Sequence, residues 1–99
     1  MFLSSTEPQT YRTYALVDPV TRLPHYVGQT ADLLGRRLEQ HVKKRQETKK
    51  GLWIRDLIRA EQWPEIVLLE EFLGTRRRAY ERESYWIQQL RGQGHPILN

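Results

Sequence analysis

At residues 10–28 the chain reads TYRTYALVDPVTRLPHYVG, and this stretch sets the architecture of the protein. Its first part, residues 10–18, alternates and is rich in tyrosine and β-branched side chains, which is typical of a strand. PVTRLP at 19–24 predicts a turn, and HYVG at 25–28 returns as a second strand. We therefore predict a β-hairpin, with Gly28 as a structural turn at which the chain leaves the second strand for a helix.

Three helices and one further strand are predicted after the hairpin. Helical spacing of apolar residues marks 30–46, a shorter helix covers 52–62, and another covers 76–90. The apolar run 65–72 is short enough to be a central strand. The order ββααβα predicts an α/β fold, in which a small three-stranded, mainly antiparallel sheet is flanked by about three helices.

The length and composition exclude several classes of protein. A chain of 99 residues is expected to form one domain over residues 1–99, with residues 1–9 as a loosely held lead-in. The absence of cysteine excludes a disulfide framework, a thiolate metal site and cysteine catalysis. No apolar run approaches the ~18–20 residues that span a membrane, and the first residues do not resemble a secretion signal. We therefore expect an intracellular protein, cytoplasmic or, in a eukaryote, nuclear.

Basic charge is concentrated in two places along the chain. The net charge is +4, from 16 Lys and Arg against 12 Asp and Glu, and the excess lies in residues 36–50 and 76–78. Clustered basic charge favours a polyanion such as nucleic acid, although a solvated, lysine-rich helix face remains the alternative on charge alone. The candidate nucleic-acid-binding residues are Arg36, Lys43, Lys44, Arg45, Lys49, Lys50, Arg76, Arg77 and Arg78.

Several polar residues fall where an ordinary core would not place them. Glu83 lies inside the apolar arc of the last predicted helix, and burial of an unpaired carboxylate is costly, so it either pairs with an arginine or holds a cation. Arg37 and His41 are four residues apart and share a helix face beside an apolar stripe, where a hydrogen-bonded border histidine is the ordinary reading. Tyr14 and Tyr26 belong to the two hairpin strands, where half-buried packing is the ordinary role.

Together these residues resemble the catalytic domain of the GIY-YIG nuclease superfamily, from about residue 11 to the end of the chain. The second signature tripeptide is present as YVG at 26–28. The first is reduced to RTY at 12–14, which keeps the tyrosine but lacks the family's glycine and isoleucine. The remaining matches follow in the family's order and are Arg37, His41, Glu83 and Asn99.

The resemblance implies an endonuclease that hydrolyses phosphodiester bonds in DNA. It implies one divalent cation, Mg²⁺ or Mn²⁺, held by Glu83, and a lone carboxylate with waters suits Mg²⁺. It also implies that Tyr14 is a general base or water-orienting group and that Tyr26 positions the water or the phosphate. A tyrosine with an ordinary pKa of ~10 is a poor base at neutral pH, so a nearby cation is expected to help deprotonate it.

The same resemblance implies roles for the remaining site residues. Arg37 would bind the phosphate that is cut and stabilise its transition-state charge. His41 would hydrogen-bond a tyrosine hydroxyl or the phosphate, and Asn99 would support the site through hydrogen bonds. The basic residues of 36–50 and 76–78 would hold flanking backbone phosphates.

Other functions remain open on the sequence. One is a non-catalytic nucleic-acid-binding module that keeps the nuclease fold, and another is a small structural protein in which Glu83 only forms an ion pair. RNA remains open as a substrate. No second DNA-binding domain is recognisable, so we expect either a stand-alone domain or a piece of a longer protein that relies on an appended or separate DNA-targeting domain.

Overall fold

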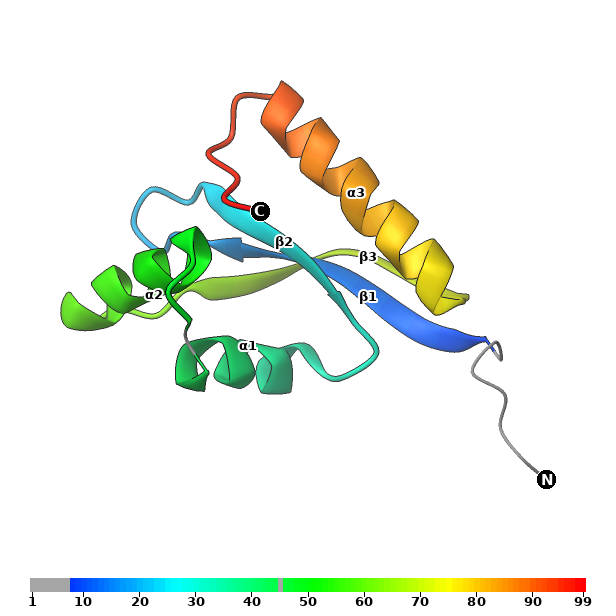
Figure 1. The fold of residues 1–99 in the computed structure, drawn as a ribbon, viewed down its shortest axis with the longest axis horizontal. Helices are drawn as coiled ribbons and strands as arrows, with labels where there is room; N and C mark the ends of the chain where they lie inside the picture. The colour runs from blue at the N-terminus through cyan, green and yellow to red at the C-terminus, as the bar shows by residue number, and fades with distance from the viewer. Residues whose placement is uncertain (1–7, 45) are drawn as a thin grey trace.

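A computed structural model describes residues 8–44 and 46–99 and confirms the ββααβα order (Figure 1). The strands are β1 (Gln9–Val17), β2 (Pro24–Thr30) and β3 (Glu65–Gly74). The helices are α1 (Leu34–Lys43), α2 (Lys49–Arg59) and α3 (Arg76–Gly92). Most of the predicted lead-in, residues 1–7, lies outside the described residues, and so does Arg45.

The sheet is antiparallel throughout, with strand order β2-β1-β3. The prediction that the third strand is central is therefore wrong, because β1 lies in the middle and β3 at an edge. Residues 13–17 of β1 are all buried, as expected for a strand covered on both faces. In β3, by contrast, Val67, Leu68 and Leu73 are exposed, so its apolar composition does not reflect a central position.

Two apolar clusters lie on opposite faces of this sheet, and Figure 1 shows α3 on one side with α1 and α2 on the other. The buried residues against α1 and α2 are Tyr14, Leu16, Val42 and Ile54. Those against α3 are Val27, Leu90 and Ile97. Because side chains alternate along a strand, β2 contributes Tyr26 to the first cluster and Val27 to the second, so one sheet holds helices on both faces.

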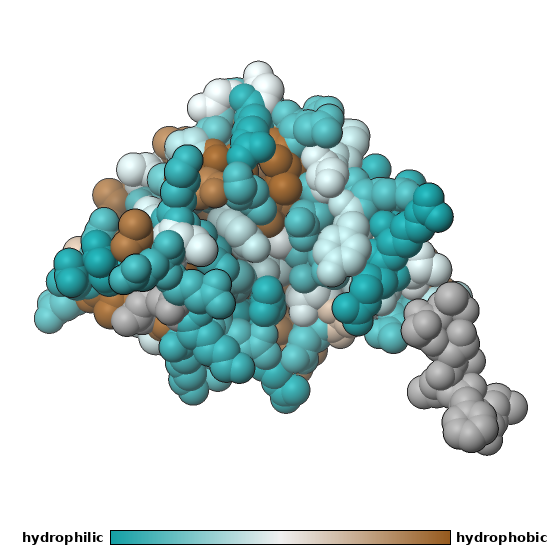
Figure 2. All heavy atoms as spheres, viewed as in Figure 1, coloured by the Kyte–Doolittle hydropathy of each residue, from teal (hydrophilic) through white to brown (hydrophobic). Residues whose placement is uncertain are grey.

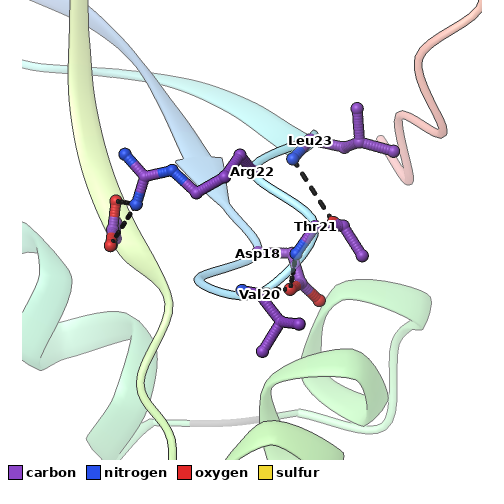
Figure 3. A network of polar contacts seen from close by, with 6 residues as sticks. Asp18, Val20, Thr21, Arg22 and Leu23 are labelled. Atoms are coloured by element: carbon purple, nitrogen blue, oxygen red, sulfur yellow. Dashed lines mark hydrogen bonds and ion pairs between the residues drawn. The ribbon is translucent and has the colours of Figure 1, made fainter.

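The hairpin loop is fixed by side-chain hydrogen bonds (Figure 3). Asp18 Oδ1 accepts hydrogen bonds from the backbone N–H groups of Val20 and Thr21, at 2.8 and 3.0 Å. Arg22 follows in the left-handed region with φ 64°, and its Nη1 donates to the Glu65 carboxylate at 2.6 Å. The loop between β1 and β2 is thereby tied to the first residue of β3.

Threonine caps begin two of the helices. Thr48 Oγ1 accepts a hydrogen bond from the Gly51 N–H at 3.1 Å, and Thr75 Oγ1 accepts one from the Arg78 N–H at 3.2 Å. Such caps satisfy donors that a helix leaves free in its first turn. They set where α2 and α3 start, and hence which faces these helices turn toward the sheet.

One face of the molecule is largely polar. On the face shown in Figure 2, hydrophilic residues predominate and the apolar patches are small and separated. Among the described residues, no helix is both long enough and apolar enough to cross a membrane.

Candidate active site

The buried Tyr14 hydroxyl is the centre of a hydrogen-bond network between β1 and α1. Arg37 Nε donates to this oxygen at 3.1 Å, and the oxygen lies 2.6 Å from His41 Nε2. An arginine can only donate, so the tyrosine oxygen accepts from Arg37, and we assign its own proton to the bond with His41 Nε2. The structure thus brings Tyr14 of the hairpin together with two residues of the following helix. In the sequence, Arg37 and His41 lie 23 and 27 residues after Tyr14.

Burial keeps both ends of the bond between Tyr14 and His41 neutral. It raises the pKa of Tyr14 to about 12, although the charge and hydrogen bond of Arg37 act in the opposite direction. It also lowers the pKa of His41 to about 3, helped by the positive charges of Lys50 and Arg37. Arg37 alone therefore does not make Tyr14 a base at neutral pH, because desolvation has the larger effect on its pKa. At neutral pH Tyr14 holds its proton, and the unprotonated Nε2 of His41 accepts the hydrogen bond from it.

The low pKa of His41 predicts a pH dependence of stability. Unfolded histidine titrates near ~6.5, so between that pH and about 3 the unfolded chain binds more protons, and acidification favours unfolding. This contribution is fully present above pH ~6.5 and is lost as the pH falls. We expect His41→Gln to flatten the decline in unfolding free energy between pH ~6.5 and ~5 by up to about 1.4 kcal/mol per pH unit. Urea denaturation at several pH values measures both slopes, and parallel slopes would contradict a buried neutral histidine.

Tyr26 of β2 faces the same histidine. The Tyr26 and His41 rings meet edge to face with centroids 5.4 Å apart, and Lys50 Nζ lies 4.8 Å from the centroid of the Tyr26 ring. Burial and the negative charge of Glu83 raise the pKa of Tyr26, whereas Arg37 lowers it. Within the described part of the chain its hydroxyl has no hydrogen-bond partner, so this hydroxyl is free to contact a substrate.

Glu83 is a partly buried carboxylate on α3. Burial raises its pKa, and the opposing influence is the charge of Arg37. The charge of Glu83 in turn raises the pKa of both Tyr14 and Tyr26, so its influence reaches the same group of residues. In residues 8–44 and 46–99, Glu83 forms no ion pair or hydrogen bond, unlike its neighbour Arg82, whose Nε donates to Glu70 at 2.7 Å. The structure therefore gives no support to the ion-pair reading of Glu83.

A cation at Glu83 would be held by one carboxylate rather than by several protein ligands. No three His, Cys, Asp or Glu residues lie together in the part of the chain that the structure describes. Mg²⁺ binds through one or two carboxylates and keeps several of its waters. The unpaired Glu83 carboxylate suits such an ion.

Gly28 has a different role from the one predicted. It lies inside β2, opposite Tyr14 in the register, so the prediction of a structural turn at Gly28 is wrong. A Cβ at this position would lie 2.3 Å from the Tyr14 hydroxyl oxygen and 2.5 Å from Cζ. Glycine is required because the Tyr14 ring crosses over it, and this crossing brings the hydroxyl to Arg37 and His41.

Asn99 acts on backbone rather than on the site side chains. Its Oδ1 accepts from the Val27 N–H at 2.9 Å, and its Nδ2 donates to the Val27 carbonyl at 2.7 Å. Next to it, the Leu98 N–H donates to the His25 carbonyl at 2.7 Å, and Arg91 Nη2 donates to the Asn99 carbonyl at 2.6 Å. The C-terminal residues therefore bond the free edge of β2 and hold the segment that carries the YVG tripeptide.

The predicted nucleic-acid-binding residues divide into two groups. Lys44 and Lys50 line a pocket of about 300 Å³ together with Arg37, Gln40, His41 and Gln46. The others described lie on exposed surface: Arg36, Lys43, Lys49, Arg76, Arg77 and Arg78. In this exposed group, Arg36 pairs with Asp32, Lys43 with Glu39, and both Arg77 and Arg78 with Glu81. The prediction for Arg45 lies outside the described residues.

Sequence reasoning missed the two glutamines of this pocket. Arg37 Nη1 donates to Gln40 Oε1 at 2.9 Å, so Gln40 fixes the guanidinium that also holds the tyrosine. Its position three residues after Arg37 places it on the same helix face, and this spacing could have identified it. Gln46 follows α1 in a loop, where no periodicity points to it.

Comparison with known protein families gives a match over most of the chain. The sequence model of the GIY-YIG catalytic domain matches residues 10–95, from β1 to just beyond the end of α3. Searches of the curated proteins and of the solved structures returned no match. Proteins with this domain are endonucleases that generally depend on a divalent metal ion and act on DNA. Because the match covers most of the chain, the protein belongs to the GIY-YIG nuclease superfamily.

Proposed function

We propose that this nuclease is a divalent-metal-dependent endonuclease that hydrolyses phosphodiester bonds in DNA. The observation that carries the proposal is the buried Tyr14 hydroxyl, held between Arg37 Nε and His41 Nε2 at 3.1 and 2.6 Å. A buried tyrosine hydroxyl is usually hydrogen-bonded, and here its partners are a charged donor and a neutral histidine that can take up a proton. This arrangement suits proton transfer beside a bound phosphate.

The proton can move along the hydrogen bond already present. An attacking water gives a proton to the Tyr14 oxygen as the tyrosine's own proton passes to His41 Nε2. Besides burial, the charges of Lys50 and Arg37 help to hold the pKa of His41 at about 3, so a bound phosphate, which offsets both charges, would make His41 a better proton acceptor. The tyrosine then never has to exist as a free anion, which its pKa of about 12 would disfavour at neutral pH. The water oxygen bonds to phosphorus, and the bond from phosphorus to the leaving oxygen breaks. The leaving oxygen takes the electron pair of that bond and then a proton from solvent.

Arg37 and Tyr26 serve the phosphate in this proposal. With Nε on Tyr14 and Nη1 on Gln40, Arg37 is held in one orientation, and Nη2 remains to donate to a phosphate oxygen. A fixed cation at that place stabilises the charge that develops in the transition state. The free Tyr26 hydroxyl would orient the phosphate or the water.

Glu83 would hold the divalent cation, Mg²⁺ or Mn²⁺. When bound, such an ion neutralises phosphate charge and stabilises the leaving oxygen. Burial disfavours the ionised form of the Glu83 carboxyl group, and a bound cation would offset this free-energy cost. Its half-buried carboxylate, without an ion-pair partner among the described residues, is the feature that supports this assignment.

The proposal is tested by incubating the protein with supercoiled plasmid, branched DNA and single-stranded RNA. We expect DNA cleavage with Mg²⁺ or Mn²⁺, its loss in EDTA, and its return when excess metal is added. Cleavage that persists in EDTA, or an absence of DNA cleavage with either metal, would contradict the proposal. A retarded DNA band without cleavage, weakening steeply as salt rises, would instead indicate a binding module.

A further inference from the structure

The pocket beside the Tyr14–His41 pair has the chemistry of an anion site. It lies between α1 and the start of α2 and has a volume of about 300 Å³, at the small end of ligand pockets. Its lining consists of three cations, two amides and a histidine that burial keeps neutral. These residues are Arg37, Lys44, Lys50, Gln40, Gln46 and His41. In the part of the chain that the structure describes, no carboxylate lines it.

The three cations of this pocket are not paired with a carboxylate among the described residues. Within the described ranges, Arg37, Lys44 and Lys50 make no ion pair, although the exposed Lys43 on α1 pairs with Glu39 at 3.8 Å. Burial and repulsion by Arg37 lower the pKa of Lys50, so its positive charge is held at a cost. Like charges gathered around a partly desolvated hollow are stabilised when an anion enters.

The hydrogen-bond donors of the pocket also remain available. Gln40 Oε1 already accepts from Arg37 Nη1, which leaves the Gln40 amide N–H groups to donate. Lys50 is held above the Tyr26 ring, with 4.8 Å between Nζ and the ring centroid, so its ammonium group is close to the proposed reaction site. By contrast, Lys49 is exposed and does not line the pocket.

We propose that this pocket is a second phosphate site, which binds one backbone phosphate of the nucleic acid next to the phosphate that is cut. Lys44 and Lys50 supply its charge, Gln40 and Gln46 supply neutral donors, and Arg37 lies between the two phosphates. The assignment rests on the proposed nuclease function for the identity of the ligand. The proposal gives Lys50 a different role from that of the exposed basic residues, because Lys50 would bind one defined phosphate.

A phosphate titration of the free protein tests the pocket without DNA. The probe is inorganic phosphate at constant ionic strength, followed by NMR through the side-chain amide signals of Gln40 and Gln46. We expect saturable shifts in the wild type and in Lys49→Gln. In Lys50→Gln we expect affinity about tenfold weaker, since a hydrogen bond to a charged group is worth at least that factor. Shifts that do not saturate, or equal affinities of the two variants, would overturn the proposal.

A second experiment locates the phosphate on DNA. Duplexes carry a single neutral methylphosphonate at successive positions around the cut, and cleavage is compared between wild type, Lys49→Gln and Lys50→Gln. We expect one position, adjacent to the cut, at which neutralisation and Lys50→Gln together cost no more than either alone. The loss of cleavage caused by Lys49→Gln should add to the loss caused by phosphate neutralisation at every position. If the effects of Lys50→Gln and of phosphate neutralisation are additive at every position, the proposal of a second phosphate site is overturned.

These outcomes are distinguishable from failure of the proposed nuclease function. If the wild type cuts no DNA but binds phosphate through Lys50, the nuclease proposal fails, and the pocket remains a phosphate site without its assignment to DNA next to a cut. If the wild type cuts DNA and the two lysine variants behave alike in both experiments, the nuclease proposal stands and the pocket assignment fails. Thermal unfolding of each variant verifies that both lysine changes leave the fold intact.

Discussion

Glu83→Gln is expected to lower the rate of DNA cleavage by about 10³-fold, since a bound metal contributes several kcal/mol to transition-state stabilisation. Glutamine keeps the size of the side chain and removes the charge that a cation needs. The measurement is single-turnover cleavage of plasmid DNA in Mg²⁺. The matched control is Glu81→Gln on the same helix, whose carboxylate pairs with Arg77 and Arg78 and should leave the rate nearly unchanged.

Thermal unfolding separates the metal-ligand reading of Glu83 from a purely structural one. Because burial raises the pKa of Glu83, its charge is not stabilising in the free protein, and Glu83→Gln should not lower stability without metal. Mg²⁺ should raise the melting temperature of the wild type, because it binds the folded state, and should leave that of Glu83→Gln unchanged. A variant that cuts at the wild-type rate would show that Glu83 is not the metal ligand. A large loss of metal-free stability would instead indicate a structural ion pair.

Gly28→Ala is expected to disable the enzyme through Tyr14. The new Cβ would lie 2.3 Å from the Tyr14 hydroxyl oxygen, so the ring must move and its hydrogen bonds to Arg37 and His41 are lost. Overpacking of this kind costs about 1–3 kcal/mol of stability. A misplacement of about 1 Å in a catalytic group lowers the rate by about 10²-fold. Urea denaturation and single-turnover cleavage measure the two effects.

The matched control for Gly28→Ala is Gly35→Ala. A Cβ at Gly35, within α1, meets no atom within 4 Å. Alanine there should raise stability by roughly 0.5–1 kcal/mol, because glycine weakens a helix, and should leave cleavage unchanged. If Gly28→Ala kept wild-type stability and activity, the position of the Tyr14 ring would not depend on the absence of a side chain at residue 28.

Much of the fold could be predicted because its signals are local. The strand alternation of residues 10–18, the turn that follows and the helical spacing around Arg37 and His41 depend only on near neighbours in the chain. The position of β3 could not be read in this way. An apolar run is compatible with a central or an edge strand, and only pairing with β1 on one side decided between them.

The candidate site could be predicted in its residue types but not in its contacts. The resemblance pointed to Tyr14, Arg37 and His41, whereas the direction of their hydrogen bonds depends on where β1 and α1 meet. Gln40 was missed, although its helical spacing from Arg37 was visible in the sequence. Lys50 was grouped with Lys49, because charge alone does not distinguish a pocket residue from an exposed one.

The sequence by itself therefore determined the order of the elements, the basic character of residues 36–50 and the family of the protein. These follow from composition, periodicity and ordered motifs, which need no knowledge of distant contacts. Only the tertiary structure decided that Gly28 makes room for a ring rather than forming a turn, and that Lys50 faces a pocket. Both depend on side chains from different elements meeting in space, and such contacts leave no local pattern in the chain.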